Sequence, residues 1–167
     1  DFPHSFGLTN NNRYAYCMNN KSEDRSKPAL MFCNWNKENP RKVLAINDRY
    51  SYLPSDRTFF SNGATLSHIP ILSDSVLVFK NDSLEKVVHF DFGGNFLLKE
   101  RPDIVSSVDN VKELMNYKGV WALYQYQETN DLVFLEYLHN IYVRYWLYNK
   151  HTQKIITSTF FFEGVCP

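Results

Sequence analysis

Short runs of apolar and aromatic residues, separated by polar turns, recur along most of the chain. Each run has the length of a β-strand and is rich in branched or aromatic side chains, which favour strands. The runs lie at 13–18, 29–35, 41–46, 74–79, 85–92, 120–127, 132–138, 141–148 and 154–162. The last four are joined by the short segments ETND, HN and NKHTQ, and such short connections join antiparallel neighbours. The pattern predicts an all-β protein whose final strands form a meander.

One segment has helical periodicity instead. Apolar residues recur every three or four positions between Val108 and Met115, which predicts a single short helix inside 106–118. The preceding connector, KERPDIV, is expected to be extended, because Pro102 disfavours helical backbone at Arg101.

A hairpin pattern occurs three times along the chain. WNKENPRKVLAI starts at Trp35, FKNDSLEKVVHF at Phe79 and YNKHTQKIITST at Tyr148. Each copy has an aromatic strand end, a polar turn with Asn and Lys, and then a β-branched strand. The first two copies are 44 residues apart and the last two 69, and removing the 25-residue segment 94–118 restores a spacing of 44. A period near 44 residues is typical of β-propeller blades.

The repeat predicts a partial β-propeller whose blades are four-stranded antiparallel meanders. The blades are expected at about 1–48, 49–93 and 119–162, with 94–118 as an insertion that carries the helix. The repeated hairpin joins the third and fourth strands of each blade. A lipocalin-like barrel is the alternative, since it is also built from meanders, but the repeat favours blades.

The stretch HFDFGGNF (89–96) combines a histidine, an aspartate and a double glycine. We interpret it as the end of a strand, with His89 and Asp91 on one side and Phe90 and Phe92 on the other. The double glycine is expected to turn the chain toward the insertion. A phosphate-binding loop is disfavoured, because no glycine-rich phosphate motif surrounds it and no helix is expected directly after it.

Two further stretches strengthen the propeller interpretation. LVFKNDSLEKVVHFDFGGNFLLKERPD (77–103) ends a strand in an aromatic-Asp-Phe-Gly step before an insertion, and FPHSFGLTNNNRYAYC (2–17) fits a blade opening. With the closing meander, they resemble the six-bladed, TolB-like β-propeller proteins of Bacteroidales. The resemblance implies that this chain supplies about three blades from the C-terminal portion of such a propeller.

The resemblance also carries expectations about location and function. It implies an exported protein, periplasmic or associated with the outer membrane, often made as a lipoprotein. The leading expectation is a non-catalytic binding or scaffolding propeller of the cell envelope. The alternative is a propeller enzyme, of lyase, lactonase or glycosidase type, acting on a carbohydrate or small molecule at the channel mouth.

Composition narrows the range of partners. Lysine plus arginine equals aspartate plus glutamate, at 18 each, so the chain lacks the basic excess typical of nucleic-acid binding or of anionic membrane surfaces. No apolar run approaches the ~20 residues of a transmembrane helix. The strand pattern is already under way at Asp1, so we expect a processed form or a fragment.

Three cysteines, Cys17, Cys33 and Cys166, are too few for a disulfide framework. A Cys17–Cys33 disulfide across a hairpin and two buried free thiols are both open, and the free thiols are favoured. Cys33 lies in an apolar strand, which favours a core position over a nucleophile.

The remaining chemistry-bearing residues do not form a recognisable motif. His89 and Asp91 are a candidate charge pair or part of a metal site, but a metal site gathers three or four ligands. The other histidines are scattered: His4, His68, His139 and His151.

Carboxylates near the insertion are candidates for a glycosidase pair, although a role on the solvated surface is favoured for them: Glu100, Asp103, Asp109 and Glu113. Several aromatic residues are candidates for sugar stacking, with a core role favoured: Trp121, Tyr124, Tyr126, Tyr145 and Trp146. We assign no catalytic residue, metal site or cofactor, and the ligand-binding residues stay open.

Three blades in an open arc leave two outer faces without a neighbouring blade. These faces are expected to carry Phe6, Tyr14 and Tyr16 at one end, and Phe134, Tyr142 and Tyr145 at the other. Large exposed apolar patches are rare in monomers. The partners expected on these faces are therefore the remaining blades of a longer chain or a second copy. A glycan or protein ligand is the further partner expected of a binding module.

Overall fold

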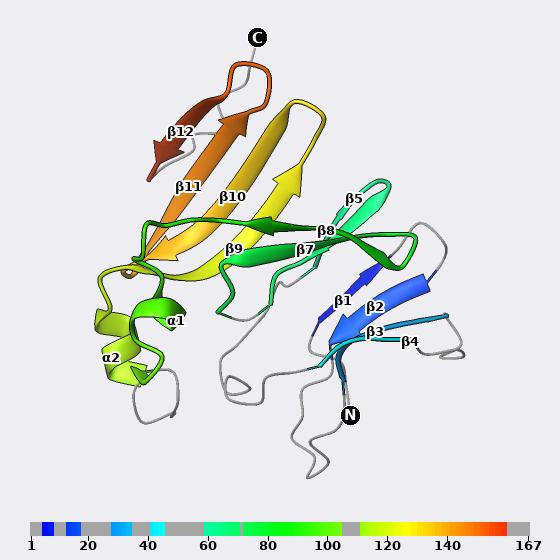
Figure 1. Ribbon diagram of the computed structural model, residues 1–167, viewed down its shortest axis with the longest axis horizontal. Coiled ribbons are helices and arrows are strands. Elements are labelled where there is room, and N and C mark those ends of the chain that lie inside the picture. The colour runs from blue at the N-terminus through cyan, green and yellow to red at the C-terminus, as the bar shows by residue number, and fades with distance from the viewer. Residues whose placement is uncertain are drawn as a thin grey trace.

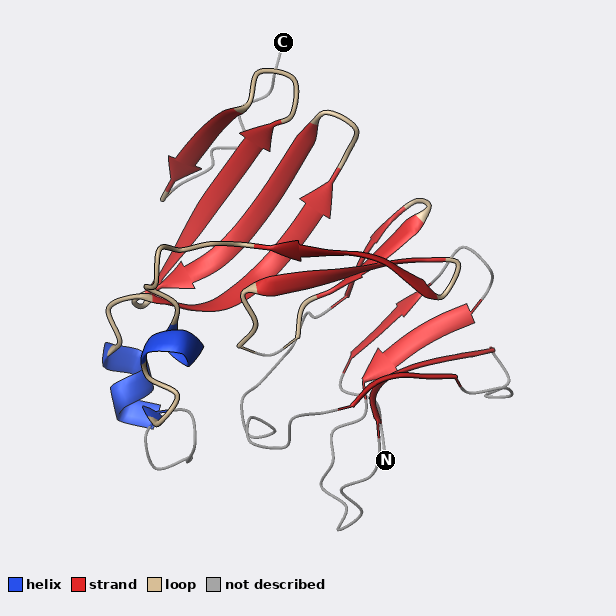
Figure 2. Ribbon diagram, viewed as in Figure 1, coloured by secondary structure: helices blue, strands red, loops and turns tan. Residues whose placement is uncertain are grey.

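The computed structural model describes residues 5–8, 13–17, 28–34, 41–45, 59–70, 72–104 and 111–159. These residues form three four-stranded antiparallel sheets and two short helices (Figures 1 and 2). Within each sheet, strands that follow one another in the sequence are hydrogen-bonded neighbours. The fold is therefore all-β and built of four-stranded meanders, as the hydrophobic pattern predicts.

The sheets follow one another along the chain. The first comprises β1 (Ser5–Leu8), β2 (Arg13–Cys17), β3 (Pro28–Asn34) and β4 (Arg41–Ala45). The second comprises β5 (Phe59–Asn62), β6 (Thr65–His68), β7 (Ser75–Lys80) and β8 (Ser83–His89). The third comprises β9 (Val120–Glu128), β10 (Leu132–His139), β11 (Tyr142–Asn149) and β12 (Lys154–Ser158). The repeated hairpin joins the third and fourth strands of every sheet.

The first strands of the sheets lie beside one another. β1 contacts β5, and β5 contacts β9, while in Figure 1 the sheets succeed one another from the lower right to the upper left. Gly7 permits the close approach of β1 to β5, because a Cβ there would lie 2.7 Å from Leu66 Cδ1 and 3.0 Å from Phe59 Cβ. Neighbouring blades of a propeller are arranged in this way around their inner strands.

The second sheet lies between the other two, and each of its faces is covered by one of them. Its side chains alternate between these two faces. Leu66 lies opposite Phe79, and both pack in the core shared with the first sheet. Val76 and Val78 point the other way and pack with side chains of the third sheet. That second core holds these buried residues: Ile69, Val76, Val78, Phe90, Leu123, Tyr126, Val133 and Leu135.

The insertion between the second and third sheets begins and ends at one place. Phe96 and Val120 form a parallel bridge, and the Val120 amide donates a 2.8 Å hydrogen bond to the Asn95 carbonyl oxygen. Between these points lie α1 (Leu97–Glu100) and α2 (Val111–Asn116). Their apolar side chains pack on a small core of their own, made of Leu72, Leu97, Ile104 and Leu114.

The helices partly depart from the expectation. α2 lies inside the segment predicted as helix. α1 begins directly after HFDFGGNF, where no helix was expected, and it ends in the first residues of KERPDIV, which was expected to be extended. Burial of Leu97 holds this single turn against the insertion core. Arg101 then leaves helical backbone, with φ −135° and ψ 63°, as a residue before proline is expected to do.

HFDFGGNF is the end of a strand followed by a turn, as interpreted from the sequence. β8 ends at His89, and alternation persists beyond it, because Phe90 is buried while Asp91 is exposed. Gly93 and Gly94 have φ of +65° and +91°, a region in which glycine carries no steric penalty. The Gly93 amide donates a 2.9 Å hydrogen bond to Asp91 Oδ1, which fixes the turn.

Cys33 is a free, buried thiol. The register of β2 and β3 places Leu30 opposite Cys17 and Tyr14 opposite Cys33, so the two cysteines are not cross-strand partners. The Cys17–Cys33 disulfide alternative is therefore wrong, and a free thiol is confirmed for Cys33. The side chain of Cys17, like those of Phe6, Tyr14 and Tyr16, lies outside the described part of the structure.

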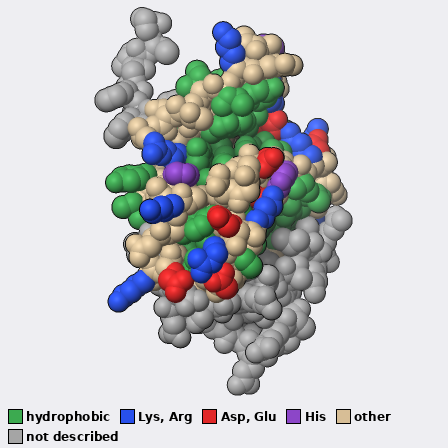
Figure 3. Space-filling view, turned by 60° about the vertical axis from the view of Figure 1, so that its left-hand side comes forward, with side chains coloured by type: hydrophobic (Ala, Val, Ile, Leu, Met, Phe, Trp, Pro, Cys, Tyr) green, Lys and Arg blue, Asp and Glu red, His purple; other side chains and the backbone are tan. Residues whose placement is uncertain are grey.

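The described surface mixes charges of both signs. In Figure 3 acidic and basic side chains lie next to one another over the face shown, with hydrophobic side chains between them. Among the described helices, none has the length and apolar character needed to cross a membrane.

Candidate pocket on the third sheet

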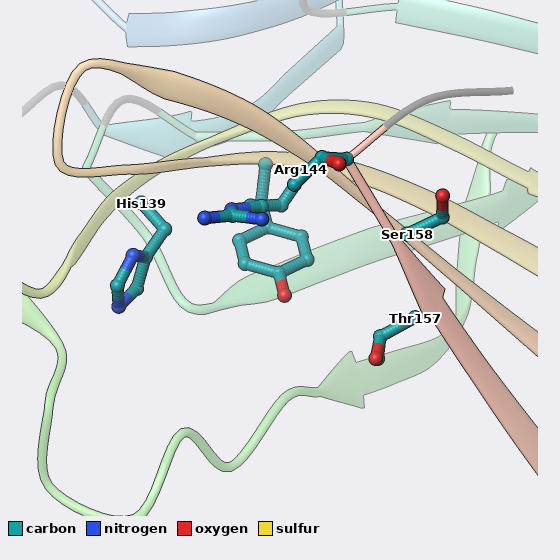
Figure 4. A pocket seen from close by; sticks show the side chains of 6 residues that line it. His139, Arg144, Thr157 and Ser158 are labelled. Carbon is teal, nitrogen blue, oxygen red and sulfur yellow. The ribbon is translucent and has the colours of Figure 1, made fainter.

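An open pocket of about 490 Å³ lies on the third sheet (Figure 4). Side chains of three adjacent strands, and the residue that follows the last of them, line it: Tyr137, His139, Arg144, Thr157, Ser158 and Thr159. Most of these side chains are polar, unlike the apolar cores between the sheets. The pocket is therefore the candidate binding site of the described residues.

The register of β10, β11 and β12 brings the pocket residues together. Arg144 lies opposite Tyr137, and Thr157 lies opposite Trp146. Because side chains two residues apart share one face of a strand, Arg144, Trp146 and Thr157 lie on the same face. Figure 4 shows the Arg144 side chain running toward His139, with Thr157 beyond it on the other side.

Arg144 and His139 offer nitrogen atoms that the described residues leave unused. The half-buried Arg144 makes no hydrogen bond or ion pair within the described part of the chain. The Nδ1 atom of His139 is buried and also lacks a hydrogen-bond partner there. Buried polar groups are usually satisfied, so this pair is suited to a ligand that accepts hydrogen bonds.

Tyr137 connects the pocket to the HFDFGGNF stretch. Its ring lies against Phe92, with ring centroids 5.4 Å apart. Burial raises the pKa of Tyr137, and the positive charge of Arg144 opposes only part of this rise. The phenol therefore keeps its proton at neutral pH and can donate a hydrogen bond.

His89 and Asp91 do not form the charge pair considered from the sequence. His89 Nδ1 lies 3.1 Å from Ser75 Oγ and 3.3 Å from Asp74 Oδ1. Burial alone would raise the pKa of Asp74, but hydrogen bonds from Lys99, at 2.9 Å, and from Ser75 lower it below its ordinary value. The partner of His89 is therefore set by the pairing of β7 with β8, not by sequence proximity.

The carboxylates of the insertion pair with their own neighbours. Glu100 accepts a 2.5 Å hydrogen bond from the Tyr117 hydroxyl. Asp103 and Glu113 both lie near Arg101, at 2.7 and 3.5 Å. These three carboxylates are on the solvated surface, as favoured from the sequence, while Asp109 lies outside the described residues.

The remaining histidines occupy separate places. His68 is buried and stacks on Phe59, with ring centroids 4.8 Å apart. His151 Nε2 lies 2.6 Å from Asp131 Oδ1 on the surface, and His4 is not among the described residues. Within the described ranges, no three His, Cys, Asp or Glu side chains gather in a group suited to a metal ion.

The aromatic candidates differ in environment. Tyr126 is buried in the core between the second and third sheets, and Trp146 packs against that core. The Trp121 indole donates a 2.6 Å hydrogen bond to the Asn140 carbonyl oxygen. Tyr145 stacks on Phe134, whereas Tyr124 is exposed.

The sequence alone did not single out Arg144. A signal for it exists, because Arg144 is the one charged residue in the apolar strand IYVRYWLY. A charge inside such a strand is unusual unless it faces a polar surface or a ligand. Thr157 carried no comparable signal, since its place beside Arg144 depends on the register of β11 and β12.

Comparison with known proteins gives a family and a fold. Residues 1–162 match the family DUF5128, described as a 6-bladed β-propeller. The crystal structure of a candidate exported protein from Bacteroides fragilis superposes with a TM-score of 0.70 at 12% sequence identity. That match covers 94% of this chain and 46% of the other, so this chain spans less than half the length of that protein. No curated protein matches the chain.

Proposed function

Because this chain belongs to the DUF5128 family of 6-bladed β-propellers, we propose that it is a non-catalytic binding or scaffolding module of the bacterial cell envelope. Propellers present loops and strand ends on a rigid frame, and such surfaces bind ligands without a fixed catalytic motif. The observation that supports binding is the pocket on β10–β12, where Arg144 and His139 offer nitrogen atoms unused by the described residues. The described carboxylates of the insertion, by contrast, are engaged by neighbouring side chains.

A ligand screen with parallel activity assays tests this proposal. Glycan and peptide arrays are probed with the purified protein, and each ligand that binds is then incubated with it and analysed for lyase, lactonase and glycosidase products. Reproducible binding without turnover is expected. Turnover of a bound ligand would replace the proposal with the propeller-enzyme alternative, and a screen without any reproducible ligand would argue against a binding role.

The proposal includes export to the periplasm or the outer membrane, as a lipoprotein of the TolB-like Bacteroidales type. Its support is the fold shared with the candidate exported protein of Bacteroides fragilis. Cell fractionation of the producing organism, combined with labelling by a radioactive fatty acid, tests this part. Recovery of the protein from the cytoplasm without label would contradict it.

The proposal also includes an arrangement and a partner. The three sheets are taken as consecutive blades of one ring, at about 1–48, 49–93 and 119–162, with the remaining blades supplied by a longer chain or by a second copy. The family description of six blades, set beside the three sheets of the described residues, supports this arrangement. Size-exclusion chromatography with light scattering on the full-length gene product tests it, since a monomer with only these three sheets would contradict it.

A further inference from the structure

We infer that the pocket on β10–β12 binds the carboxylate group of a small hydroxylated acid, such as a sugar acid. This inference rests on the proposed binding function and names the class of ligand for that same site. It follows from the charge of the pocket, the geometry of Arg144 and the hydroxyl groups around it.

The charge of the pocket matches a single negative charge. Among the described residues that line the pocket, Arg144 is the one with a permanent positive charge, and none of them is an aspartate or a glutamate. A guanidinium group presents its N–H donors in a planar fork, which fits the two oxygens of a carboxylate. A phosphate dianion is usually held by more than one cation or by a group of backbone amides, so a carboxylate fits this pocket better.

Arg144 is held in place for such a contact. It lies opposite Tyr137 in the β10–β11 pairing, and it is half-buried. Partial burial strengthens the attraction between a guanidinium and a bound carboxylate relative to the same pair in water. His139, whose Nδ1 is buried without a partner among the described residues, lies at the end toward which the Arg144 side chain runs (Figure 4).

The remaining lining fits the hydroxylated part of the ligand. Thr157 and Thr159 contribute side-chain hydroxyl groups, and Tyr137 contributes a phenol on an aromatic ring. Hydroxyl groups both donate and accept hydrogen bonds, as the hydroxyls of a sugar do, and an aromatic ring packs on the apolar face of a sugar. The volume of about 490 Å³ lies within the roughly 300–1,000 Å³ of small-molecule pockets.

Isothermal titration calorimetry with three related sugars tests the inference. Glucuronate carries the carboxylate, glucose lacks it, and glucose 6-phosphate replaces it with a phosphate. We expect glucuronate to bind the wild-type protein at least about tenfold more tightly than either of the others. Equal affinity for glucose would show that the carboxylate is not recognised, and tighter binding of glucose 6-phosphate would assign the pocket to phosphate; either result overturns the inference.

Variants then locate the site. Arg144→Lys keeps the charge but loses the planar fork, and we expect it to weaken glucuronate binding by about tenfold. Thr157→Val, at an exposed position, removes a hydroxyl without a change in shape and is expected to weaken binding less. The control is Arg101→Lys, because Arg101 lies in the insertion and is engaged by Asp103, and it should bind glucuronate as the wild type does. Circular dichroism confirms that each variant is folded.

The outcomes separate this inference from the proposed function. Glucuronate affinity that is unchanged in both Arg144→Lys and Thr157→Val overturns the site. An array ligand that binds equally well to wild type and Arg144→Lys, together with no binding of glucuronate, would leave the proposed binding function in place and overturn this inference alone.

Discussion

Glu128 binds two lysines that come from different parts of the chain. Lys86 on β8 and Lys150 after β11 each place Nζ 2.7 Å from one of its carboxylate oxygens. The Tyr126 hydroxyl donates a further hydrogen bond of 2.5 Å. Burial alone would raise the pKa of Glu128, but the hydrogen bonds from Lys150, Lys86 and Tyr126 outweigh it and lower the pKa to about 2. One carboxylate thus joins the second sheet to the third.

This pKa predicts how stability depends on pH. Because the folded-state pKa of Glu128 is lowered from 4.5 to about 2, its contribution is present above pH 4.5 and is lost as the pH falls toward 2. The shift corresponds to about 3 kcal/mol of unfolding free energy. The difference in unfolding free energy between wild type and Glu128→Gln should therefore be largest near pH 6 and narrow steadily toward pH 3, as measured by urea denaturation.

A neighbouring glutamate provides the control. Glu85 on β8 is exposed and lies 3.9 Å from Lys80, so Glu85→Gln should differ little from wild type at either pH. If the difference in unfolding free energy between wild type and Glu128→Gln stays constant from pH 6 to pH 3, Glu128 does not provide the predicted stabilisation.

A second charge pair joins the first sheet to the second. Arg13 on β2 donates a 2.7 Å hydrogen bond to Asp82, whose side chain is only 4% exposed. Asp82 lies in the β7–β8 turn with φ +61°, a conformation that asparagine also tolerates. Asp82→Asn should therefore keep the turn but remove the negative charge. We expect it to lower the unfolding free energy by about 2–4 kcal/mol, since the half-buried Arg13 guanidinium loses its charged partner.

A double-mutant cycle measures this coupling. Arg13→Met removes the other charge, and the double variant Arg13→Met with Asp82→Asn should lose less stability than the two single losses combined. Additive losses in urea denaturation would show that the two residues stabilise the fold independently.

The strands and hairpins were the elements most readily predicted from the sequence. The third sheet matches the predicted runs closely, because each run is long and apolar and the turns between them are short. The turn helix α1 was missed, since four residues give no helical period and its position depends on burial of Leu97 in the insertion core. The short helix α2 was found because its apolar residues do repeat at helical spacing.

Sequence reasoning located the candidate site less well than the fold. The partner of His89 and the neighbours of Arg144 are set by strand register, which aligns residues far apart in the sequence. Asp91 is two residues from His89 but serves the turn at Gly93. Proximity in the sequence was therefore a poor guide to the contacts of these polar side chains.

The contact between β1 and β5 makes a prediction about Gly7. A methyl group at this position would lie 2.7 Å from Leu66 Cδ1 and 3.0 Å from Phe59 Cβ, so the buried Leu66 side chain or the two strands would have to shift. We expect Gly7→Ala to lower the unfolding free energy by about 1–3 kcal/mol, as overpacking does. Thermal unfolding measures this, with exposed Ser61 on β5 providing the control variant Ser61→Ala. Equal melting temperatures for the two variants would contradict the close approach.

At the scale of the whole molecule, the outer face of the third sheet has no neighbouring sheet among the described residues. The second sheet covers the opposite face, where Leu135 and Tyr126 are buried. On the outer face, Val143 and Ile156 are exposed, while Phe134 and Tyr145 are half-buried and stack on each other. Tyr142, expected on the outer face, shares the face of its strand partner His139 instead.

Substitutions at two adjacent isoleucines test whether another sheet covers the outer face of the third sheet. Ile155 and Ile156 on β12 are 57% and 59% exposed, but they point to opposite faces. If a further blade packs on the outer face, Ile156→Asp places a charge in that interface and should lower the urea midpoint of the full-length protein, whereas Ile155→Asp should change it little. Equal effects of the two substitutions would contradict the packing.

The parallel bridge between Phe96 and Val120 has a consequence for protein engineering. Because the insertion leaves and rejoins the framework at adjacent backbone positions, its length can change without altering the distance that the framework must span. Its apolar residues also form a separate small core. This makes the insertion between Phe96 and Val120 a natural place for a fluorescent reporter or an affinity tag, and it offers evolution a place to exchange a whole functional segment while the sheets are inherited unchanged.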